Sequence, residues 1–181
     1  MALRFLKTAF QDYLRVGGVV PSSKYTCQRV ASKLSPRCLN IVEYGGGTGA
    51  VTRELLKKLP ASGKLIVIEV QKEFIKALQE IDDPRMLVIH GDVGEYSAKL
   101  KELFPKGPDA VVCGIPLLFF KEAFRNTLLK NTCDGLSPEG RFIIYQHSLQ
   151  IVKTLKKIFS LVKFDLEIRN FPPYFIFTAF K

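Results

Sequence analysis

The stretch Ile41–Thr52, with the sequence IVEYGGGTGAVT, decides the fold of this chain. An apolar, β-branched run leads to an acid, Glu43, and four glycines then fall within five positions. Backbone N–H groups at a strand-to-helix turn can approach a ligand closely only where side chains are absent. The helix that follows adds the positive end of its dipole. The stretch therefore predicts a strand, a ligand-binding turn and a helix that begins at Ala50; a tight turn without a ligand is the alternative.

Apolar runs of strand character alternate with segments of helical period along the rest of the chain. The predicted strands are Asn40–Tyr44, Lys64–Val70, Met86–His90, Ala110–Gly114, Arg141–Gln146, Asp165–Arg169 and Tyr174–Phe180. The predicted helices are Leu3–Arg15, Ser23–Leu34, Ala50–Leu59, Glu73–Ile81, Ala98–Phe104, Lys121–Gly135 and Ser148–Val162. This alternation favours right-handed crossovers and a mostly parallel sheet with helices on both faces. Only NFPP joins the last two strands, so we expect them to form an antiparallel hairpin.

The composition indicates a polyanionic partner. The 181 residues are 47% hydrophobic, which suits one globular domain, and they carry a formal net charge of +10. A basic surplus of this size favours either nucleic acid or an anionic membrane surface. The four cysteines show no C-x-x-C pairing and there are two histidines, so we expect reduced thiols and no metal site. Neither a membrane-spanning run nor a signal-peptide pattern is present, so we expect a cytoplasmic protein.

The glycine loop has the spacing G-x-G-x-G, one residue shorter than the usual dinucleotide pattern. With the preceding acid, the motif EYGGGTG resembles the S-adenosylmethionine (SAM) loop of class I methyltransferases. This resemblance implies SAM as the cofactor. It also implies an α/β, Rossmann-like fold, with a doubly wound, mostly parallel seven-stranded sheet that ends in an antiparallel hairpin and is preceded by N-terminal helices.

Two further acids stand where such a fold would use them. Glu69 ends the second strand, where an acid commonly binds ribose hydroxyls. Asp92 follows the third strand, where the resemblance implies a contact with the adenine amino group. The alternatives without a ligand are a surface glutamate at position 69 and a turn-forming Gly-Asp pair at positions 91 and 92. The complete predicted cofactor site is Glu43, Tyr44, Gly45, Gly47, Thr48, Gly49, Glu69, Val70, Gly91, Asp92, Val93, Gly114 and Ile115.

The segment after the fourth strand reads Gly114-Ile115-Pro116-Leu117. Enzymes that methylate base amines typically have Asn/Asp-Pro-Pro-Tyr/Phe here, and rRNA adenine dimethylases have Asn-Leu-Pro-Tyr. Both the polar acceptor side chain and the stacking ring are therefore missing. A buried base amine without that partner would lose about 1–3 kcal/mol. This departure counts against a base substrate, although the Gly114 carbonyl could still accept a hydrogen bond.

Several segments together resemble the small bacterial phospholipid N-methyltransferases. They are VGGVVPSSKYTCQRVA (16–31), VEYGGGTGAVTREL (42–55), VIHGDV (88–93), DAVVCGIPLLFF (109–120) and NFPPYFIFTAF (170–180). Gly46 stands where that family usually has proline, and Cys113 where it has serine. The resemblance implies methylation of phosphatidylethanolamine by a peripheral protein at the inner face of the membrane. The alternatives are an RNA adenine N-methyltransferase and a SAM-binding protein without catalysis.

The first predicted helix is amphipathic. Leu3, Leu6, Phe10 and Leu14 recur at helical spacing, with basic residues beside this stripe. Such a helix can lie in a membrane interface, or it can cover the edge of the sheet. We expect residues 1–35 to form a helical segment that faces membrane and substrate, and residues 36–181 to form the methyltransferase domain. The predicted contacts to the membrane or the lipid phosphate are Arg4, Lys7, Arg15 and Lys24.

Few side chains are expected to take part in the reaction itself. Methyl transfer from a sulfonium mainly requires alignment of a neutral amine and exclusion of water. The candidates for contact with that amine are Tyr25, Tyr145 and Gly114. A tyrosine could accept a hydrogen bond from the amine, and its ring could stabilise a growing cation. His90 and His147 are expected to be structural, and the NFPPYF segment is expected to be a turn.

Overall fold

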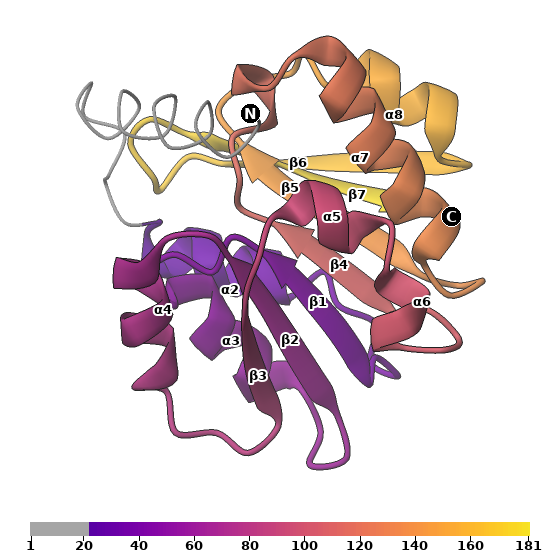
Figure 1. The fold of residues 1–181 in the computed structure, drawn as a ribbon. Helices are drawn as coiled ribbons and strands as arrows, with labels where there is room; N and C mark the ends of the chain where they lie inside the picture. The colour runs from indigo at the N-terminus through magenta and orange to yellow at the C-terminus, as the bar shows by residue number, and fades with distance from the viewer. Residues whose placement is uncertain (1–21) are drawn as a thin grey trace.

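A seven-stranded sheet with the strand order β3-β2-β1-β4-β5-β7-β6 forms the middle layer of the structure (Figure 1). The computed structural model describes residues 22–181. The strands are β1 Asn40–Tyr44, β2 Lys64–Glu69, β3 Met86–His90, β4 Ala110–Cys113, β5 Arg141–Gln146, β6 Leu161–Glu167 and β7 Tyr174–Phe180. The helices are α2 Lys24–Ala31, α3 Ala50–Lys58, α4 Lys72–Gln79, α5 Val93–Ser97, α6 Leu100–Leu103, α7 Glu122–Gly135 and α8 Val152–Ile158, with a 3₁₀ turn, η1, at Leu117–Phe119.

The direction of each strand brings the functional loops to one edge of the sheet. Strands β1 to β5 pair in parallel, whereas β7 is antiparallel to both β5 and β6. Strand β6 therefore runs parallel to β5, and its last residues lie at the same edge as the ends of β1–β5. We call this the carboxyl edge. The arrangement confirms the predicted doubly wound sheet and its terminal hairpin.

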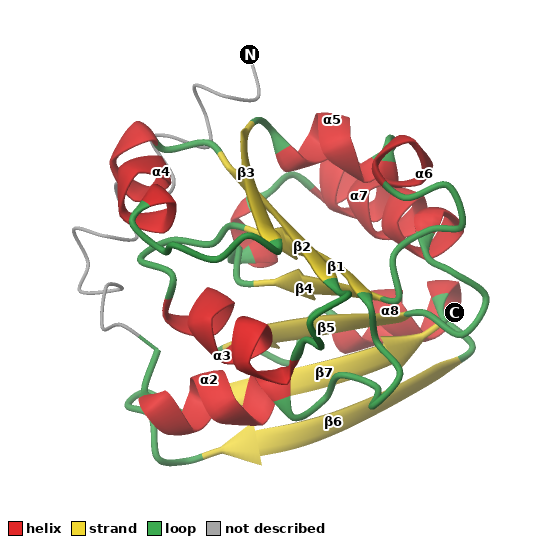
Figure 2. Cartoon of the chain, turned by 90° about the horizontal axis from the view of Figure 1, so that it is seen from below, coloured by secondary structure: helices red, strands yellow, loops and turns green. Residues whose placement is uncertain are grey.

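Helices cover both faces of the sheet (Figure 2). Alternate residues of one strand point to opposite faces, so Ile41 packs in the core under α2, α3 and α4, whereas Val42 packs in the core under α5, α6, α7 and α8. Because both faces are buried, β1, β2 and β4 are nearly continuous apolar runs. This explains why these strands are readable from the sequence.

Two predicted helices have the wrong bounds. The predicted helix Ser148–Val162 is too long, because α8 ends at Ile158 and β6 begins at Leu161, four residues before the predicted strand. Leu161 and Val162 pair with Phe180 and Ala179 of β7, and this non-local pairing decides the conformation of an ambiguous segment. The predicted helix Ala98–Phe104 contains the shorter helix α6, and the preceding helix α5 was not predicted.

Helix α2 lies within the predicted helix Ser23–Leu34 and packs against α3 and β6. The Ser23 hydroxyl caps it by accepting from the Thr26 amide at 3.3 Å. The predicted helix Leu3–Arg15 lies outside the described residues, and the division between 1–35 and 36–181 stays a prediction. No helix in the described part of the chain is both long and apolar enough to cross a membrane. All four cysteines are buried free thiols.

Candidate cofactor and acceptor site

The glycine loop between β1 and α3 lies at the carboxyl edge, where the strand order reverses between β1 and β4. Ligands bind at such switch points in open α/β sheets. Gly45, Gly47 and Gly49 have φ angles of 75°, 53° and 79°, a region that side chains disfavour. A Cβ atom added at Gly47 would meet no atom within 4 Å. The loop therefore presents bare backbone to open space at Gly47, as a cofactor-binding turn requires.

Gly46 faces the opposite way, toward the protein. A Cβ atom there would lie 2.6 Å from Val67 Cγ1 and 2.9 Å from Leu78 Cδ1. This packing explains why Gly46 is not the proline that is usual in the phospholipid N-methyltransferases the sequence resembles.

Glu43 is buried beneath the glycine loop, and one of its two carboxylate oxygens has no hydrogen-bond partner in the described part of the chain. Oε2 accepts from Thr52 Oγ1 at 2.7 Å, whereas Oε1 has no partner among residues 22–181. Burial raises the pKa of Glu43 to about 8; the Thr52 hydroxyl opposes this rise, and the nearby Glu69 charge adds to it. A cation brought to Oε1 would satisfy the orphaned oxygen and favour the ionised form. The methionine ammonium of SAM is such a cation.

Glu69 links the end of β2 to the glycine loop. Its Oε1 accepts from the amides of Val70 at 2.8 Å and Gln71 at 2.9 Å, and Oε2 accepts from the Gly47 amide at 3.1 Å. A carboxylate offers about four lone-pair sites, so one remains, on Oε2. A ribose would place its first hydroxyl there, and a second hydroxyl would have to displace the Gly47 amide.

Asp92 caps α5 with one of its two carboxylate oxygens. Oδ1 accepts from the Gly94 amide at 2.7 Å, whereas the buried Oδ2 has no partner within the described part of the chain. An amino donor such as that of adenine fits this oxygen. With Glu43 and the open space at Gly47, these observations show that the residues present fit SAM, which supplies a methyl group on a sulfonium when bound.

The remaining predicted cofactor residues lie on the same loops but contribute differently. The Tyr44 side chain points into the core, where its hydroxyl lies 3.2 Å from Thr132 Oγ1, so only its backbone is available at the edge. The Ile115 side chain packs directly on Gly45. Thr48 is exposed, and Val70, Gly91 and Val93 follow the ends of β2 and β3. Their roles as cofactor contacts stay predictions.

On the acceptor side, Gly114 and Tyr145 are brought together. A Cβ atom at Gly114 would collide with the Tyr145 hydroxyl, because that hydroxyl fills the space a side chain would need. Burial raises the pKa of Tyr145 well above its ordinary value, and the charge of Glu43 adds to the effect. Tyr145 is therefore a neutral phenol at physiological pH, with an oxygen that can accept a hydrogen bond.

Two residues that were not predicted to belong to the site, Tyr174 and His147, lie next to Tyr145. The ring centroids of Tyr145 and Tyr174 are 5.6 Å apart, and those of Tyr174 and His147 are 3.9 Å apart. His147 Nδ1 also lies 2.8 Å from the Pro173 carbonyl oxygen, which can only accept. The predicted hairpin could have indicated this neighbourhood, because its turn lies at the carboxyl edge and β7 begins there beside the end of β5.

Tyr25, the other predicted tyrosine, has a different neighbour. Its ring lies under the Arg169 guanidinium, whose carbon is 4.3 Å from the ring centroid, and Lys24 Nζ is 5.2 Å from the same centroid. One of its faces is thus already occupied by a cation of the protein itself. The predicted contacts Arg4, Lys7 and Arg15 lie outside the described residues.

Comparisons with known proteins show the family of this chain. The family described as ribosomal RNA adenine dimethylase matches residues 22–123. An ornithine lipid N-methyltransferase from Singulisphaera acidiphila is 25% identical over 173 residues, which are 93% of this chain and 90% of that protein.

Solved structures share the fold. A 1,6-didemethyltoxoflavin N1-methyltransferase from Burkholderia thailandensis, solved with its toxoflavin ligand and S-adenosylhomocysteine, has a TM-score of 0.74 at 16% identity, covering 98% of this chain and 88% of that one. Spermidine synthase from Thermotoga maritima has a TM-score of 0.70 at 21% identity, covering 88% of this chain and 60% of that one. At such identities the likeness concerns the fold alone. The family match spans more than half of the chain, so this SAM-dependent methyltransferase belongs to the ribosomal RNA adenine dimethylase family.

Proposed function

We propose that the enzyme methylates the amine of a membrane-lipid head group, with phosphatidylethanolamine as the first candidate substrate. The observation that carries the proposal is the contact between Gly114 and Tyr145. Base-amine methyltransferases place an Asn or Asp side chain at this position, and here the Tyr145 hydroxyl fills the space that such a side chain would need. The partner of the amine must therefore be something other than a side chain at position 114.

The groups around Tyr145 suit an aliphatic amine. The neutral Tyr145 phenol can accept a hydrogen bond from the uncharged amine and hold its lone pair toward the methyl group. As the nitrogen becomes positively charged, the ring faces of Tyr145 and Tyr174 can stabilise it through cation–π attraction. An ethanolamine nitrogen that gains methyl groups approaches the quaternary ammonium that aromatic rings bind well.

The ornithine lipid N-methyltransferase also supports a lipid amine. It is related to this chain over nearly its whole length and carries out an N-methylation on a lipid. Ornithine lipid is for this reason the second lipid candidate. A lipid substrate would place the enzyme at the inner face of the membrane, in contact with an anionic surface, which the net charge of +10 favours.

RNA adenine methylation is the second candidate function. The family match and the basic net charge favour it. In that case the Gly114 carbonyl would have to accept from the base amine, and a ring other than the usual motif aromatic would have to stack on the base.

The deciding experiment offers all acceptors to the enzyme at once. Purified protein is incubated with methyl-labelled SAM, vesicles of phosphatidylethanolamine or ornithine lipid, and unmodified ribosomal RNA, and the phases are then separated. We expect label in the organic phase, and none with a Glu69→Ala variant. Label confined to RNA would reject the lipid proposal and establish the second candidate.

A further inference from the structure

We infer that the turn between β6 and β7 is a membrane-docking surface that inserts apolar side chains into an anionic lipid bilayer beside the acceptor site. The inference rests on the proposed lipid function and names the surface through which the substrate would be reached. We define the hairpin patch as Phe164, Leu166, Ile168 and Phe171. Their exposed fractions are 65%, 43%, 71% and 88%.

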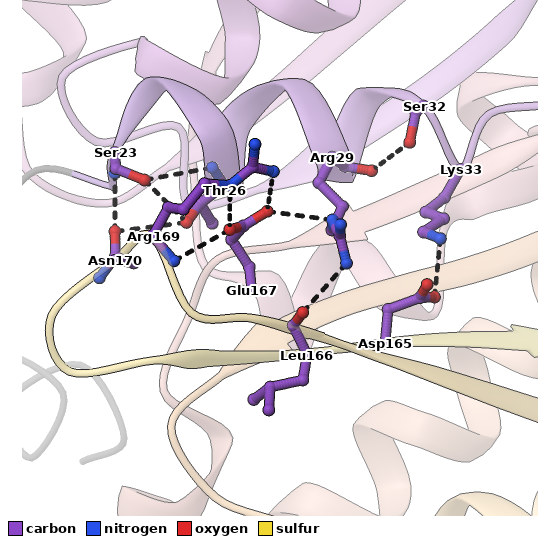
Figure 3. A network of polar contacts seen from close by, with 10 residues as sticks. All are labelled: Ser23, Thr26, Arg29, Ser32, Lys33, Asp165, Leu166, Glu167, Arg169 and Asn170. Carbon is purple, nitrogen blue, oxygen red and sulfur yellow. Dashed lines mark hydrogen bonds and ion pairs between the residues drawn. The ribbon is translucent and has the colours of Figure 1, made fainter.

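The side chains of the hairpin patch that belong to β6 point away from α2. Asp165 and Glu167 point toward α2, where Asp165 pairs with Lys33 at 2.7 Å and Glu167 with Arg29 at 3.0 Å (Figure 3). Because side chains alternate along a strand, Phe164 and Leu166 point to the other face, and the exposed Ile168 follows the end of β6. Figure 3 shows Leu166 turned away from α2. Helix α8 packs on the opposite, amino-terminal part of this face, where Val162 joins the core.

The turn that carries Phe171 is held firmly. Asn170 is buried, and its Oδ1 accepts from the Ser23 amide at 2.7 Å and from Thr26 Oγ1 at 3.3 Å. Its Nδ2 donates to the Pro172 carbonyl at 2.9 Å. A fixed turn therefore presents Phe171 and Ile168 to solvent. Contiguous exposed apolar side chains on a soluble protein usually mark an interaction site.

The surrounding charges favour an anionic bilayer as the partner. The acids closest to the patch are neutralised, since Glu167 is bound by Arg29 and Arg169 and Asp165 by Lys33. Lys24 is exposed beside the turn, and the Arg169 side chain remains half exposed. Around the patch the four cations Lys24, Arg29, Lys33 and Arg169 outnumber the two acids, and apolar side chains beside a cationic surplus match an anionic membrane interface. The patch is also continuous with the site, because Tyr174 follows the turn and contacts Tyr145.

A second copy that added a strand to β6 is less well supported. The Leu166 carbonyl on this edge strand already accepts from Arg29 Nη1 at 3.0 Å. Lys163, Asp165 and Glu167 alternate with the apolar residues, and charges along an edge strand discourage strand pairing.

The chain contains no tryptophan, so a single introduced tryptophan can report on the patch. We propose Phe171→Trp, with Leu87→Trp on the opposite edge strand β3 as the control, because Leu87 is 56% exposed. Vesicles of equal amounts of phosphatidylglycerol and phosphatidylethanolamine, with and without brominated acyl chains, are added to the full-length variants. We expect a blue shift and bromine quenching for Phe171→Trp and neither for Leu87→Trp. In flotation, Ile168→Ser with Phe171→Ser should weaken vesicle binding by roughly tenfold per residue, and Leu87→Ser should not.

Other results would overturn the inference. Equal changes in the fluorescence of Phe171→Trp and Leu87→Trp on addition of vesicles would show that the turn is not the part that inserts. If the fluorescence emission of Phe171→Trp is blue-shifted already without vesicles, another part of the protein covers the patch. A shift that depends on protein concentration would assign the patch to a second copy, and a shift that does not would assign it to residues 1–21 of this chain. Quenching by single-stranded RNA but not by brominated lipid would assign it to nucleic acid.

The failure of docking is distinguishable from the failure of the proposed function. Label transferred to lipid in vesicles without insertion of the Phe171→Trp reporter would reject docking alone. Insertion of the reporter, with no label in lipid presented either in vesicles or in detergent micelles, would reject the lipid substrate alone.

Discussion

Glu43 and Glu167 are both buried glutamates, and their pKa values are shifted in opposite directions. Burial raises the pKa of Glu43 to about 8, because among residues 22–181 only the Thr52 hydroxyl donates to its carboxylate. Hydrogen bonds from the Arg169 side chain lower the pKa of Glu167 to about 2, against the effect of burial. The difference follows from the partners, since a charge with matched donors is stabilised where an unpaired one is not. Glu167 is therefore a structural ion-pair member, whereas Glu43 is set up to receive a cation.

Glu43 makes cofactor affinity dependent on pH. Below about pH 8 the ligand-free carboxyl is protonated, and an ammonium favours its ionised form, so binding must release a proton. We expect SAM affinity to rise by up to about tenfold per pH unit as the pH approaches 8 from below. Calorimetry in buffers of different ionisation enthalpy would measure the released proton. Glu43→Gln should bind SAM more weakly and without this dependence; an unchanged pH profile in that variant would move the titration to another group.

In the ligand-free protein, ionisation of Glu43 should lower the free energy of unfolding as the pH rises. The folded-state pKa of Glu43 lies above the ordinary value of 4.5, so the folded state holds the extra proton between these values. Its contribution to the free energy of unfolding therefore decreases as the pH rises from 4.5 to 8. Saturating SAM should remove much of this decrease, because the bound cation compensates the carboxylate.

Gly47 and Glu69 provide the direct test of the cofactor site. Gly47→Val would place a side chain in the open space above the loop and would also strain a backbone with φ of 53°. Glu69→Ala would remove both the hydroxyl acceptor and the partner of the Gly47 amide. We expect calorimetry to show no measurable SAM binding for either variant, with the fold largely retained by circular dichroism. Glu80→Ala, at an exposed position, serves as the control; wild-type affinity in both loop variants would disprove the assignment.

At the scale of elements, the sequence was sufficient where local pattern and tertiary environment agree. Strand β1 is an apolar run buried on both faces, and its bounds were predicted correctly. Strand β6 has its starting residues Leu161–Lys163 next to a helix, and only their pairing with β7 makes them strand. No local signal distinguishes that pairing from one more helical turn. The contact between His147 and Tyr174 was not predicted for the same reason, because it joins segments 27 positions apart in the chain.

The contact between α2 and the hairpin depends on Glu167. Its Oε1 lies 2.8 Å from Arg169 Nε, and its Oε2 lies 3.0 Å from Arg29 Nε, so one carboxylate joins two elements. We expect Glu167→Gln to lower the melting temperature by roughly 3–6 °C at neutral pH, since it loses two charged hydrogen bonds. Glu139→Gln is the matched control, because Glu139 pairs with Arg37 at 3.6 Å on the exposed surface and such pairs contribute little.

Protonation of Glu167 should also contribute to the loss of stability at acid pH. Its folded-state pKa of about 2 lies below the ordinary value of 4.5, so its contribution is complete above 4.5 and is lost as the pH falls toward 2. Melting temperatures of the wild type should decrease across this interval more steeply than those of Glu167→Gln. Parallel curves would show that other carboxyl groups dominate acid unfolding.

At the scale of the whole molecule, one edge of the sheet collects every group that function would need. The glycine loop, Glu69, Asp92, Gly114, Tyr145 and the hairpin turn all lie at or just after the ends of strands that run in the same direction. An enzyme of this form could approach a surface with its carboxyl edge first and keep its cofactor within reach of a lipid head group. The chain entering α2 reaches the same edge, because the Ser23 amide is bonded to Asn170 of the turn.

The last prediction concerns the charges of residues 1–21. If Arg4, Lys7 and Arg15 lie near an anionic surface, each contributes roughly 1 kcal/mol, and changing all three to Gln should weaken vesicle binding by about two decades at low salt. Lys153→Gln, Lys156→Gln and Lys157→Gln together remove the same charge from α8 and should have a much smaller effect. The loss should shrink at 1 M salt, where the Debye length is about 3 Å, whereas the loss caused by the apolar hairpin variants should persist. SAM affinity should not change, because the glycine loop is formed by other residues. Equal losses in the two charge variants would mean that the membrane senses the net charge of +10 as a whole rather than the N-terminal segment.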